Sequence, residues 1–269
     1  MDIQDYNPWA LYDEMIEGVP EGIKVLDYGW GLTWCYLQSE VGMGLALSDK
    51  GGRPSKNHGL YDDWRGRDLK EICKLAKSWS FMEASMGIAA LNSWYSRPEL
   101  LDPWGAKYEV AKTIRRDQRK RDSFIELLPY MEGKDVTVIG HFPHVYTLAD
   151  HCRNLTVLER NPHDSNDMPD PACEYILPSQ GMTLITGTTL INKTAPRLLQ
   201  LCEPGITVLT GPSTVSSPIL FNYGVDIIAG SVVADPELAA FLCRNGRGKL
   251  FGEAVQMMRI VNPKLGLDI

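Results

Sequence analysis

The spacing of apolar residues changes midway along the chain and divides it into two parts. Between Gly22 and Ser48, three short apolar runs alternate with turns, which predicts an antiparallel β-meander. From Lys134 onward, apolar strand-like runs alternate with helical stretches, as is typical of a mostly parallel, doubly wound sheet. We therefore predict a two-domain α/β protein, with an α+β domain over residues 1–110 and a parallel-sheet domain over residues 111–269.

The first part is also expected to contain three helices, at Trp9–Glu17, Asp68–Ser78 and Phe81–Tyr95. Small residues on the last helix, among them Gly87, would let another backbone approach closely. Glu83 fits a capping box with Ser80. Asn92 on the same helix is a candidate ligand residue, although a buried amide with backbone partners is the alternative.

The second part contains five candidate strands, at Val136–Ile139, Leu155–Leu158, Thr183–Thr186, Thr207–Thr210 and Asp226–Ala229. Helical stretches are expected near Val145–Cys152, Thr194–Cys202, Ile219–Tyr223 and Pro236–Arg244. The residues between 97 and 112, with two prolines and a glycine, are expected to connect the domains.

Glycine or polar residues follow each of the five strands. The turns of a parallel sheet meet at its carboxyl edge, where such folds bind ligands, so their combination predicts a small-molecule site. Its candidate residues are Gly140, His141, Phe142, Glu159, Asn161, Gly187, Thr188, Asn192, Gly211, Pro212 and Ser213. Ser213 lacks the G-x-S-x-G context of a hydrolase nucleophile.

The first of these turns reads Gly-His-Phe-Pro and is expected to open a helix at Pro143, whose N-terminus would favour an anion beside His141. Glu159 lies nineteen residues after Gly140, where dinucleotide-binding sheets place the acid that contacts ribose. The turn lacks the other two glycines of that motif, which argues against NAD. Glu159 could instead bind a diol, an amine or a metal, or be a structural carboxylate.

His141 is the better candidate for a metal ligand, with His144 three residues later as a second imidazole or as a structural hydrogen-bonding partner. Asp164, Asp167 and Asp170 follow the second strand without the order of a calcium loop, so turn formation and solvation are expected of them. The long glycine-containing loop from 48 to 67 is typical of a binding loop or lid.

Composition and charge argue against several classes of partner and location. The formal net charge of −7 argues against partners such as nucleic acid or a membrane surface, and the charged run at 115–121 reads as a solvated helix face. No apolar run reaches the length of a membrane span, and the N-terminus lacks the pattern of a signal peptide. Six well-separated cysteines suit reduced thiols in a cytoplasmic protein. A homo-oligomer is compatible with the sequence.

Several stretches together resemble a bacterial and archaeal family of unknown function described as "putative heavy-metal chelation" proteins, domain of unknown function 364. They are Glu83–Asn92, Gly140–Pro143, Met168–Pro178, Ile185–Asn192, Gly211–Ser213 and Gly224–Ser231. The resemblance implies an N-terminal domain similar to the small capping domain of enolases, a Rossmann-like C-terminal domain and a site in the cleft between them. Lys193 stands where the family often has glycine, which adds a positive charge near that site.

These observations favour a protein that binds a small anionic metabolite, or a heavy-metal ion or chelate, between its domains. His141 and Glu159 would bind the metal, a divalent transition ion, or act as acid and base. One alternative is a transferase-type enzyme whose nucleoside cofactor contacts Glu159. Another is a metal sensor or carrier without catalysis.

Overall fold

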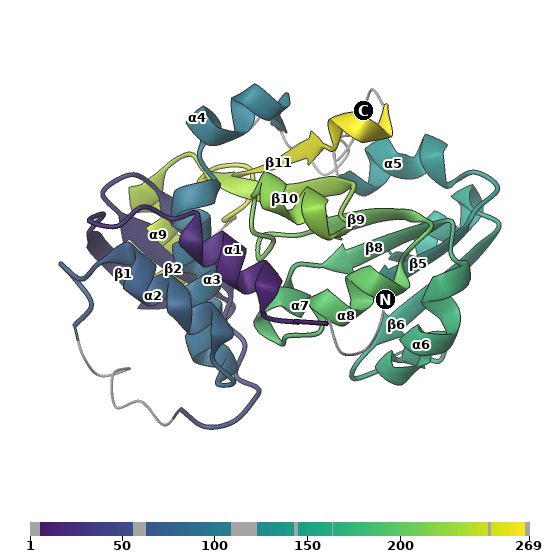
Figure 1. The fold of residues 1–269 in the computed structure, drawn as a ribbon, viewed down its shortest axis with the longest axis horizontal. Coiled ribbons are helices and arrows are strands. Elements are labelled where there is room, and N and C mark those ends of the chain that lie inside the picture. The colour runs from purple at the N-terminus through teal and green to yellow at the C-terminus, as the bar shows by residue number, and fades with distance from the viewer. Residues whose placement is uncertain are drawn as a thin grey trace.

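The computed structural model describes residues 6–55, 63–108, 123–142, 145–162, 164–246 and 249–266. Within these ranges the chain forms a three-stranded and an eight-stranded sheet, which lie side by side with helices around them (Figure 1). The expected α/β class is confirmed. Four predicted features lie outside the described residues and stay predictions. They are the charged run at 115–121, the domain boundary at 110/111, Pro143 and His144.

The small sheet is the antiparallel meander that the N-terminal pattern predicts. Its strands are β1 (Val25–Trp30), β2 (Trp34–Ser39) and β3 (Met43–Leu47), paired in that order. The helices of this half are α1 (Ala10–Glu17), α2 (Leu69–Cys73), the 3-10 helix η3 (Lys74–Lys77) and α3 (Phe81–Tyr95). The expected helix over Asp68–Ser78 is therefore divided in two, and Asp68 caps its first part by accepting the N–H of Lys70.

Helix α3 is held between η3 and β3 through glycines. A Cβ on Gly87 would lie 2.0 Å from the backbone nitrogen of Ala76 in η3, and a Cβ on Gly44 of β3 would lie 2.2 Å from the carbonyl oxygen of Ala89. The close backbone approach predicted for this helix is thus present. The predicted capping box is absent, because the Ser80 side chain caps no N–H and the Glu83 carboxylate instead accepts the hydroxyls of Ser55 and Ser78.

The large sheet has the strand order β4-β11-β10-β9-β8-β5-β6-β7. Its strands are β4 (Lys107–Tyr108), β5 (Asp135–Ile139), β6 (Asn154–Glu159), β7 (Asp167–Pro169), β8 (Met182–Thr186), β9 (Ile206–Thr210), β10 (Ile227–Val233) and β11 (Val255–Val261). The strands from β10 through β9, β8, β5 and β6 to β7 are parallel, and β11 and β4 extend the sheet at one edge with antiparallel pairing. The strand order reverses between β5 and β8, so their carboxyl ends form a crevice in which such sheets bind ligands.

The remaining helices are α4 (Pro98–Leu101), η4 (Asp102–Trp104), α5 (Ser123–Met131), η6 (Val145–His151), η7 (Asp170–Ala172), α6 (Cys173–Ile176), η8 (Leu177–Ser179), α7 (Thr188–Ile191), α8 (Ala195–Leu201), η9 (Pro218–Tyr223), α9 (Pro236–Asn245) and η10 (Pro263–Leu265). Two of the expected helices, after β5 and before β10, are 3-10 helices. Gly224, at φ +84°, ends η9 after six residues. No α-helix starts beside His141 in the described chain, so the expected attraction of an anion by a helix dipole is not supported there.

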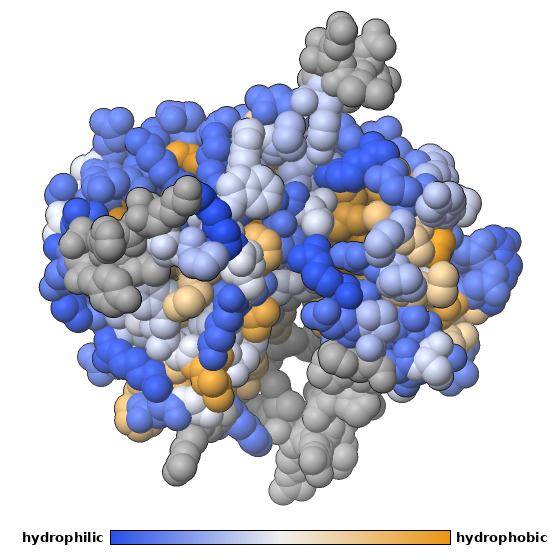
Figure 2. All heavy atoms as spheres, turned by 90° about the horizontal axis from the view of Figure 1, so that it is seen from below, coloured by the Kyte–Doolittle hydropathy of each residue, from blue (hydrophilic) through white to orange (hydrophobic). Residues whose placement is uncertain are grey.

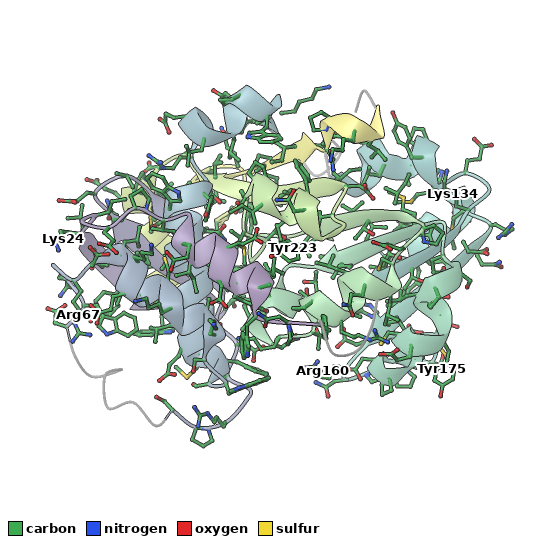
Figure 3. The ribbon with its side chains drawn as sticks, viewed as in Figure 1. Lys24, Arg67, Lys134, Arg160, Tyr175 and Tyr223 are labelled. Atoms are coloured by element: carbon green, nitrogen blue, oxygen red, sulfur yellow. The ribbon has the colours of Figure 1, made fainter. Side chains whose placement is uncertain are left out.

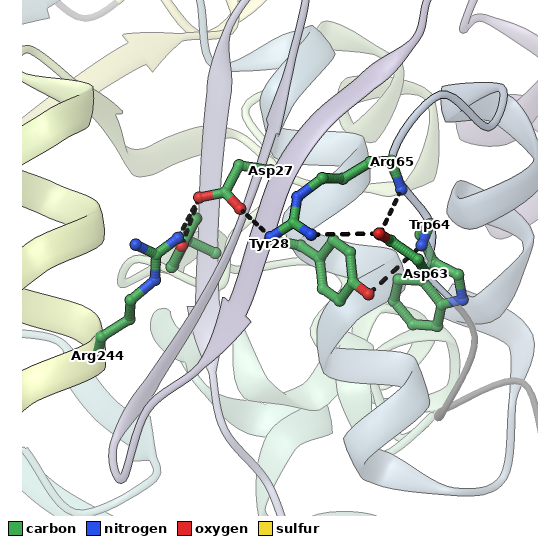
Figure 4. A network of polar contacts seen from close by, with 7 residues as sticks. Asp27, Tyr28, Asp63, Trp64, Arg65 and Arg244 are labelled. Carbon is green, nitrogen blue, oxygen red and sulfur yellow. Dashed lines mark hydrogen bonds and ion pairs between the residues drawn. The ribbon is translucent and has the colours of Figure 1, made fainter.

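Helix α9 comes from the C-terminal half but packs on the small sheet (Figure 1). Its residues Ala239, Ala240 and Cys243 share a buried apolar cluster with Tyr36 and Leu45. An ion pair between Arg244 and Asp27 of β1 fastens the helix, and Arg65 approaches the same carboxylate at 3.1 Å (Figure 4). Burial alone would raise the pKa of Asp27, but hydrogen bonds from Tyr36 and Arg65 and the charge of Arg244 outweigh it and lower that pKa.

Polar contacts also join the two halves directly. The hydroxyl of Tyr12 in α1 donates to the carbonyl of Leu190 at 2.8 Å, and that of Tyr223, near the centre of Figure 3, donates to Glu14 at 2.6 Å. One buried cluster contains core residues of both halves. Among the described helices, none combines the length and apolar character needed to cross a membrane.

Candidate functional site

A cavity of about 460 Å³ lies at the carboxyl ends of β5, β6 and β8, at the point where the strand order reverses. Its apolar wall is formed by Ile139, Leu158, Pro171, Cys173 and Leu198. Figure 2 shows hydrophobic patches bordered by hydrophilic side chains on the face seen from below. All described lining residues lie between 139 and 198, in the C-terminal half. The expected position between the domains therefore stays a prediction.

Four of the candidate residues line this cavity, namely Gly140, Glu159, Thr188 and Asn192. Gly140 has φ +99°, a conformation that favours glycine, and its N–H donates to the carbonyl of Leu158. Glu159 accepts two backbone N–H groups, from His141 at 2.9 Å and from Asn161 at 3.2 Å. Its carboxylate is therefore fixed in direction at the cavity wall.

His141 lies next to this carboxylate and is held by a second one. Its Nδ1 is 3.2 Å from Oδ1 of Asp167, whose side chain is fully buried, while the imidazole is 32% exposed. Asp167 also accepts the hydroxyl of Tyr146 at 2.6 Å and the N–H of Asp164 at 3.1 Å. Burial, followed by the hydrogen bond to Asp167, raises the pKa of Tyr146. With Nδ1–H donated to Asp167, the Nε2 of His141 is left as an acceptor, which is the form that binds metals.

The role of Asp167 was not predicted from the sequence, because turn formation and solvation were expected for all three aspartates. Asp164 does form a local turn, since its carboxylate accepts the N–H of Asn166 at 2.9 Å, and Asp170 pairs with Arg160 at 3.0 Å. Asp167 differs because it belongs to β7, which pairs with β6 and turns the side chain inward. A strand of three residues leaves too short an apolar pattern to recognise.

Another group of candidate residues lies at the junction of the two halves instead of in the cavity. Ser213, 2% exposed, accepts the N–H of Leu47 at 2.9 Å. Asn92, also 2% exposed, donates to the carbonyls of Leu45 at 3.0 Å and Pro212 at 3.4 Å. A Cβ on Gly187 would lie 2.3 Å from the backbone nitrogen of Thr214, so this glycine permits close packing of two turns. Gly211, at φ +102°, begins the second of these turns.

The two other candidates, Phe142 and Asn161, are not among the residues that line the cavity. Phe142 is half-buried and packs on a buried apolar cluster that contains Val138 and Val157, and Asn161 is exposed. Residues that the sequence reasoning did not select line the wall, among them Arg160, which is labelled below the centre of Figure 3. Arg197 and Glu174 form a two-point ion pair at 2.6 and 2.9 Å, and hydrogen bonding by Arg197 lowers the pKa of Glu174.

The described residues do not offer a preformed cage for a bare ion. No group of three or more histidine, cysteine, aspartate or glutamate side chains comes together in that part of the chain. All six cysteines are free thiols, four of them buried, in agreement with the expected absence of a disulfide framework. A bare ion would therefore find no complete set of such protein ligands among the described residues.

Lys193 connects the cavity with the N-terminal half. Its Nζ donates to the carbonyl of Ile191 at 2.5 Å and lies 5.7 Å from the ring centre of Tyr12 and 5.9 Å from that of Phe81. Burial lowers its pKa from 10.5 to about 7, and the charge of Asp49 opposes this only in part. Its φ of +70° is a conformation that costs a side chain roughly 1 kcal/mol or more and that glycine adopts freely.

We expect Lys193→Gly to stabilise the protein by about 1 kcal/mol at pH 7, because it relieves the backbone and removes the buried amine. The pKa of Lys193 is lower in the folded protein than in the unfolded chain, so between pH 7 and 10.5 the unfolded chain binds more protons. The stability of the wild type therefore increases as the pH rises through that range. The advantage of the variant should therefore shrink as the pH rises, which urea unfolding at pH 6.5 and 9 would measure.

Lys193→Ala is the control, since it removes the amine but keeps the strained backbone, and it should lack the part of the gain that comes from the backbone. A glycine variant less stable than the wild type would show that the amine holds the two halves together.

The comparisons with known proteins agree with this architecture. The family DUF364, described as "Putative heavy-metal chelation", matches residues 123–261, and DUF4213, with the same description, matches residues 12–95. The chain belongs to the DUF364 family. A solved DUF364 protein of unknown function from Desulfitobacterium hafniense is 32% identical, with a TM-score of 0.83 over 94% of this chain and 98% of that one.

Two further proteins are similar to this chain. A solved DUF364 structure from Pyrococcus horikoshii shares the fold, with a TM-score of 0.71 and 22% identity over 94% of this chain and 98% of that chain. An uncharacterized protein of Methanocaldococcus jannaschii is 26% identical over 233 residues, which are 81% of this chain and 82% of the relative. The descriptions of both DUF families point to heavy-metal chelation as the function to test.

Proposed function

We propose that this protein binds a metal chelate, or a small anionic metabolite that carries a metal, at the carboxyl edge of the large sheet. The observation that carries the proposal is the imidazole of His141, which the buried Asp167 orients, in a residue whose backbone N–H is bound by Glu159 at the cavity wall. A histidine held by a carboxylate in this way is the usual arrangement of a metal-binding imidazole. The description of the family as heavy-metal chelation supports the same ligand class.

His141 would give one protein ligand and Glu159 a second, and the small molecule would complete the coordination. Both oxygens of Glu159 already accept an N–H, which leaves a lone pair on each for a further contact. Divalent transition ions that accept imidazole nitrogen together with carboxylate oxygen, such as Zn²⁺, Ni²⁺ or Cu²⁺, suit this pair. Binding alone would make the protein a carrier or sensor; chemistry on the bound ligand would make it an enzyme.

The test is the change in melting temperature on adding Zn²⁺, Ni²⁺ or Cu²⁺, alone and as citrate chelates. A ligand at a hundred times its Kd stabilises the folded state by roughly 2.7 kcal/mol, and we expect His141→Ala to abolish most of that gain. His151→Ala is the matched control, since His151 is an exposed histidine at the end of η6 and should change nothing. The proposal is wrong if the His141 variant keeps the full stabilisation.

Retention of metal separates the remaining alternatives. A carrier should keep a stoichiometric metal through purification and show no turnover. A catalyst should release a changed ligand when it is supplied with the metal and candidate small acids.

A further inference from the structure

We infer that the cavity beside Glu159 binds a ribonucleoside moiety, with the carboxylate of Glu159 accepting both hydroxyls of the ribose. This inference does not depend on the role of His141, and it assigns to the carboxylate of Glu159 a ligand other than the metal. It rests on the fixed direction of one carboxylate, on the size and lining of the cavity, and on the charges around it.

Two backbone hydrogen bonds fix the direction of the Glu159 carboxylate. Each oxygen of Glu159 is fixed by one backbone N–H, from His141 at 2.9 Å and from Asn161 at 3.2 Å. A carboxylate oxygen has room for a second hydrogen bond, so the group presents two acceptors side by side to the cavity that it lines. A vicinal diol offers two donors at the matching spacing, and an acid at the end of this strand is where doubly wound sheets recognise ribose.

The cavity has room for the rest of a nucleoside. Its volume of about 460 Å³ lies within the range of small-molecule sites. Leu158, Pro171 and Cys173 form an apolar surface next to Glu159 on which a flat ring can lie. Thr186, Thr188 and Asn192, at and after the end of β8, also line the cavity and add two hydroxyls and an amide that can pair with polar ring atoms.

The charges argue against a ligand with a diphosphate. The cavity is lined by three acidic residues, Glu159, Asp170 and Glu174, and by three basic ones, Arg160, Lys193 and Arg197, so their formal charges cancel. Two of the cations are already paired, Arg160 with Asp170 and Arg197 with Glu174. The helix that follows β5 in the described chain is a 3-10 helix of seven residues, whose dipole is smaller than that of the longer α-helix that usually faces a pyrophosphate. An uncharged nucleoside, or one with a small substituent on its 5′ carbon, fits this lining.

Calorimetric titration with adenosine, guanosine, cytidine and uridine tests the inference, together with the 2′-deoxy and 3′-deoxy forms of each. At least one ribonucleoside should bind the full-length protein, and its deoxy forms should bind about 10- to 100-fold more weakly because one carboxylate oxygen loses its partner. Absence of binding by all four ribonucleosides, or equal binding of the ribo and deoxy forms, would overturn the inference.

A second titration uses the variant Glu159→Gln. Its amide nitrogen donates and cannot accept, so one of the two acceptors is lost, and binding of the best ribonucleoside should fall to about the level of its deoxy forms. Glu132→Gln, an exposed glutamate just before β5, is the matched control and should bind like the wild type. The comparison of ribo and deoxy ligands on the wild type decides the question even if the Glu159 variant folds poorly. Because no metal is present in these titrations, their failure would leave the metal proposal, tested through His141, untouched.

Discussion

Replacing Gly44 with alanine is expected to destabilise the protein by about 3 kcal/mol, the largest effect that we predict for a single methyl group. A Cβ at this position would lie 2.2 Å from the carbonyl oxygen of Ala89, 2.3 Å from the nitrogen of Ser93 and 2.5 Å from the carbonyl carbon of Asn92. All three are backbone atoms of α3, which cannot rotate away as a side chain could.

The helix also cannot retreat, because its other side is in close contact. Gly87 brings α3 against η3, where an added Cβ would be 2.0 Å from the nitrogen of Ala76. Relief of the clash at Gly44 would therefore force η3 to move with the helix. Interiors packed this tightly transmit such strain instead of absorbing it.

Urea unfolding followed by circular dichroism measures the effect. Gly181→Ala is the control, since its backbone φ is not positive and its nearest neighbours are side-chain atoms of Lys134, at 3.0 Å and beyond. That change should cost less than about 1 kcal/mol. If both variants lost similar stability, close approach at Gly44 would not be the reason for the glycine.

Asn92→Ala is the second change with a large expected effect, a loss of about 3 kcal/mol. The Asn92 side chain donates to the carbonyls of Leu45 and Pro212, and its Oδ1 accepts the hydroxyl of Ser96 at 3.0 Å and the N–H of Ser216 at 3.3 Å. Ser216 is fully buried, so its N–H would lose this partner where water cannot replace it. An unsatisfied buried group costs about 1–3 kcal/mol, to which the small void adds.

Ser93→Ala is a neighbouring control, because Ser93 is equally buried but its shorter hydrogen bond, at 2.9 Å, goes to the carbonyl of Ala90 within its own helix, and its contact with the hydroxyl of Ser39 is longer, at 3.3 Å. We expect it to cost about 1 kcal/mol. Unfolding free energies should be measured together with ligand affinity. A ligand-binding role for Asn92, which the sequence predicts, would instead weaken binding while leaving stability nearly unchanged.

Local sequence patterns were sufficient to predict most strands, because a strand buried on both faces needs an uninterrupted apolar run. The runs at Val136–Ile139 and Thr207–Thr210 fall within β5 and β9. The edge strands β4 and β7, of two and three residues, were missed since such short segments contain no periodicity. The seven-residue strand β11 was missed as well, although its antiparallel pairing with β10 makes it a full member of the sheet.

For the candidate site, sequence spacing indicated that Gly140, His141 and Glu159 belong to turns at one sheet edge, and the structure places these turns side by side. The sequence spacing did not indicate that Asp167 holds the imidazole of His141. These two residues are 26 positions apart, and only the pairing of β7 with β6 brings them together. Likewise, nothing local to Ser213 or Asn92 reveals that both lie at the junction of the two halves.

The sequence by itself determined the α/β class, the order of the main elements and the turns that carry polar groups, since each of these depends on residues close together in the chain. The tertiary structure alone decided that α9 covers the small sheet, with Arg244 paired to Asp27, and that four of the candidate turns divide between a cavity and a packed junction. The fifth predicted turn, after Asp226–Ala229, was wrong, because β10 continues through it to Val233. These features come from contacts between residues that are far apart in sequence. Such contacts depend on how whole faces fit together, and no local pattern encodes that fit.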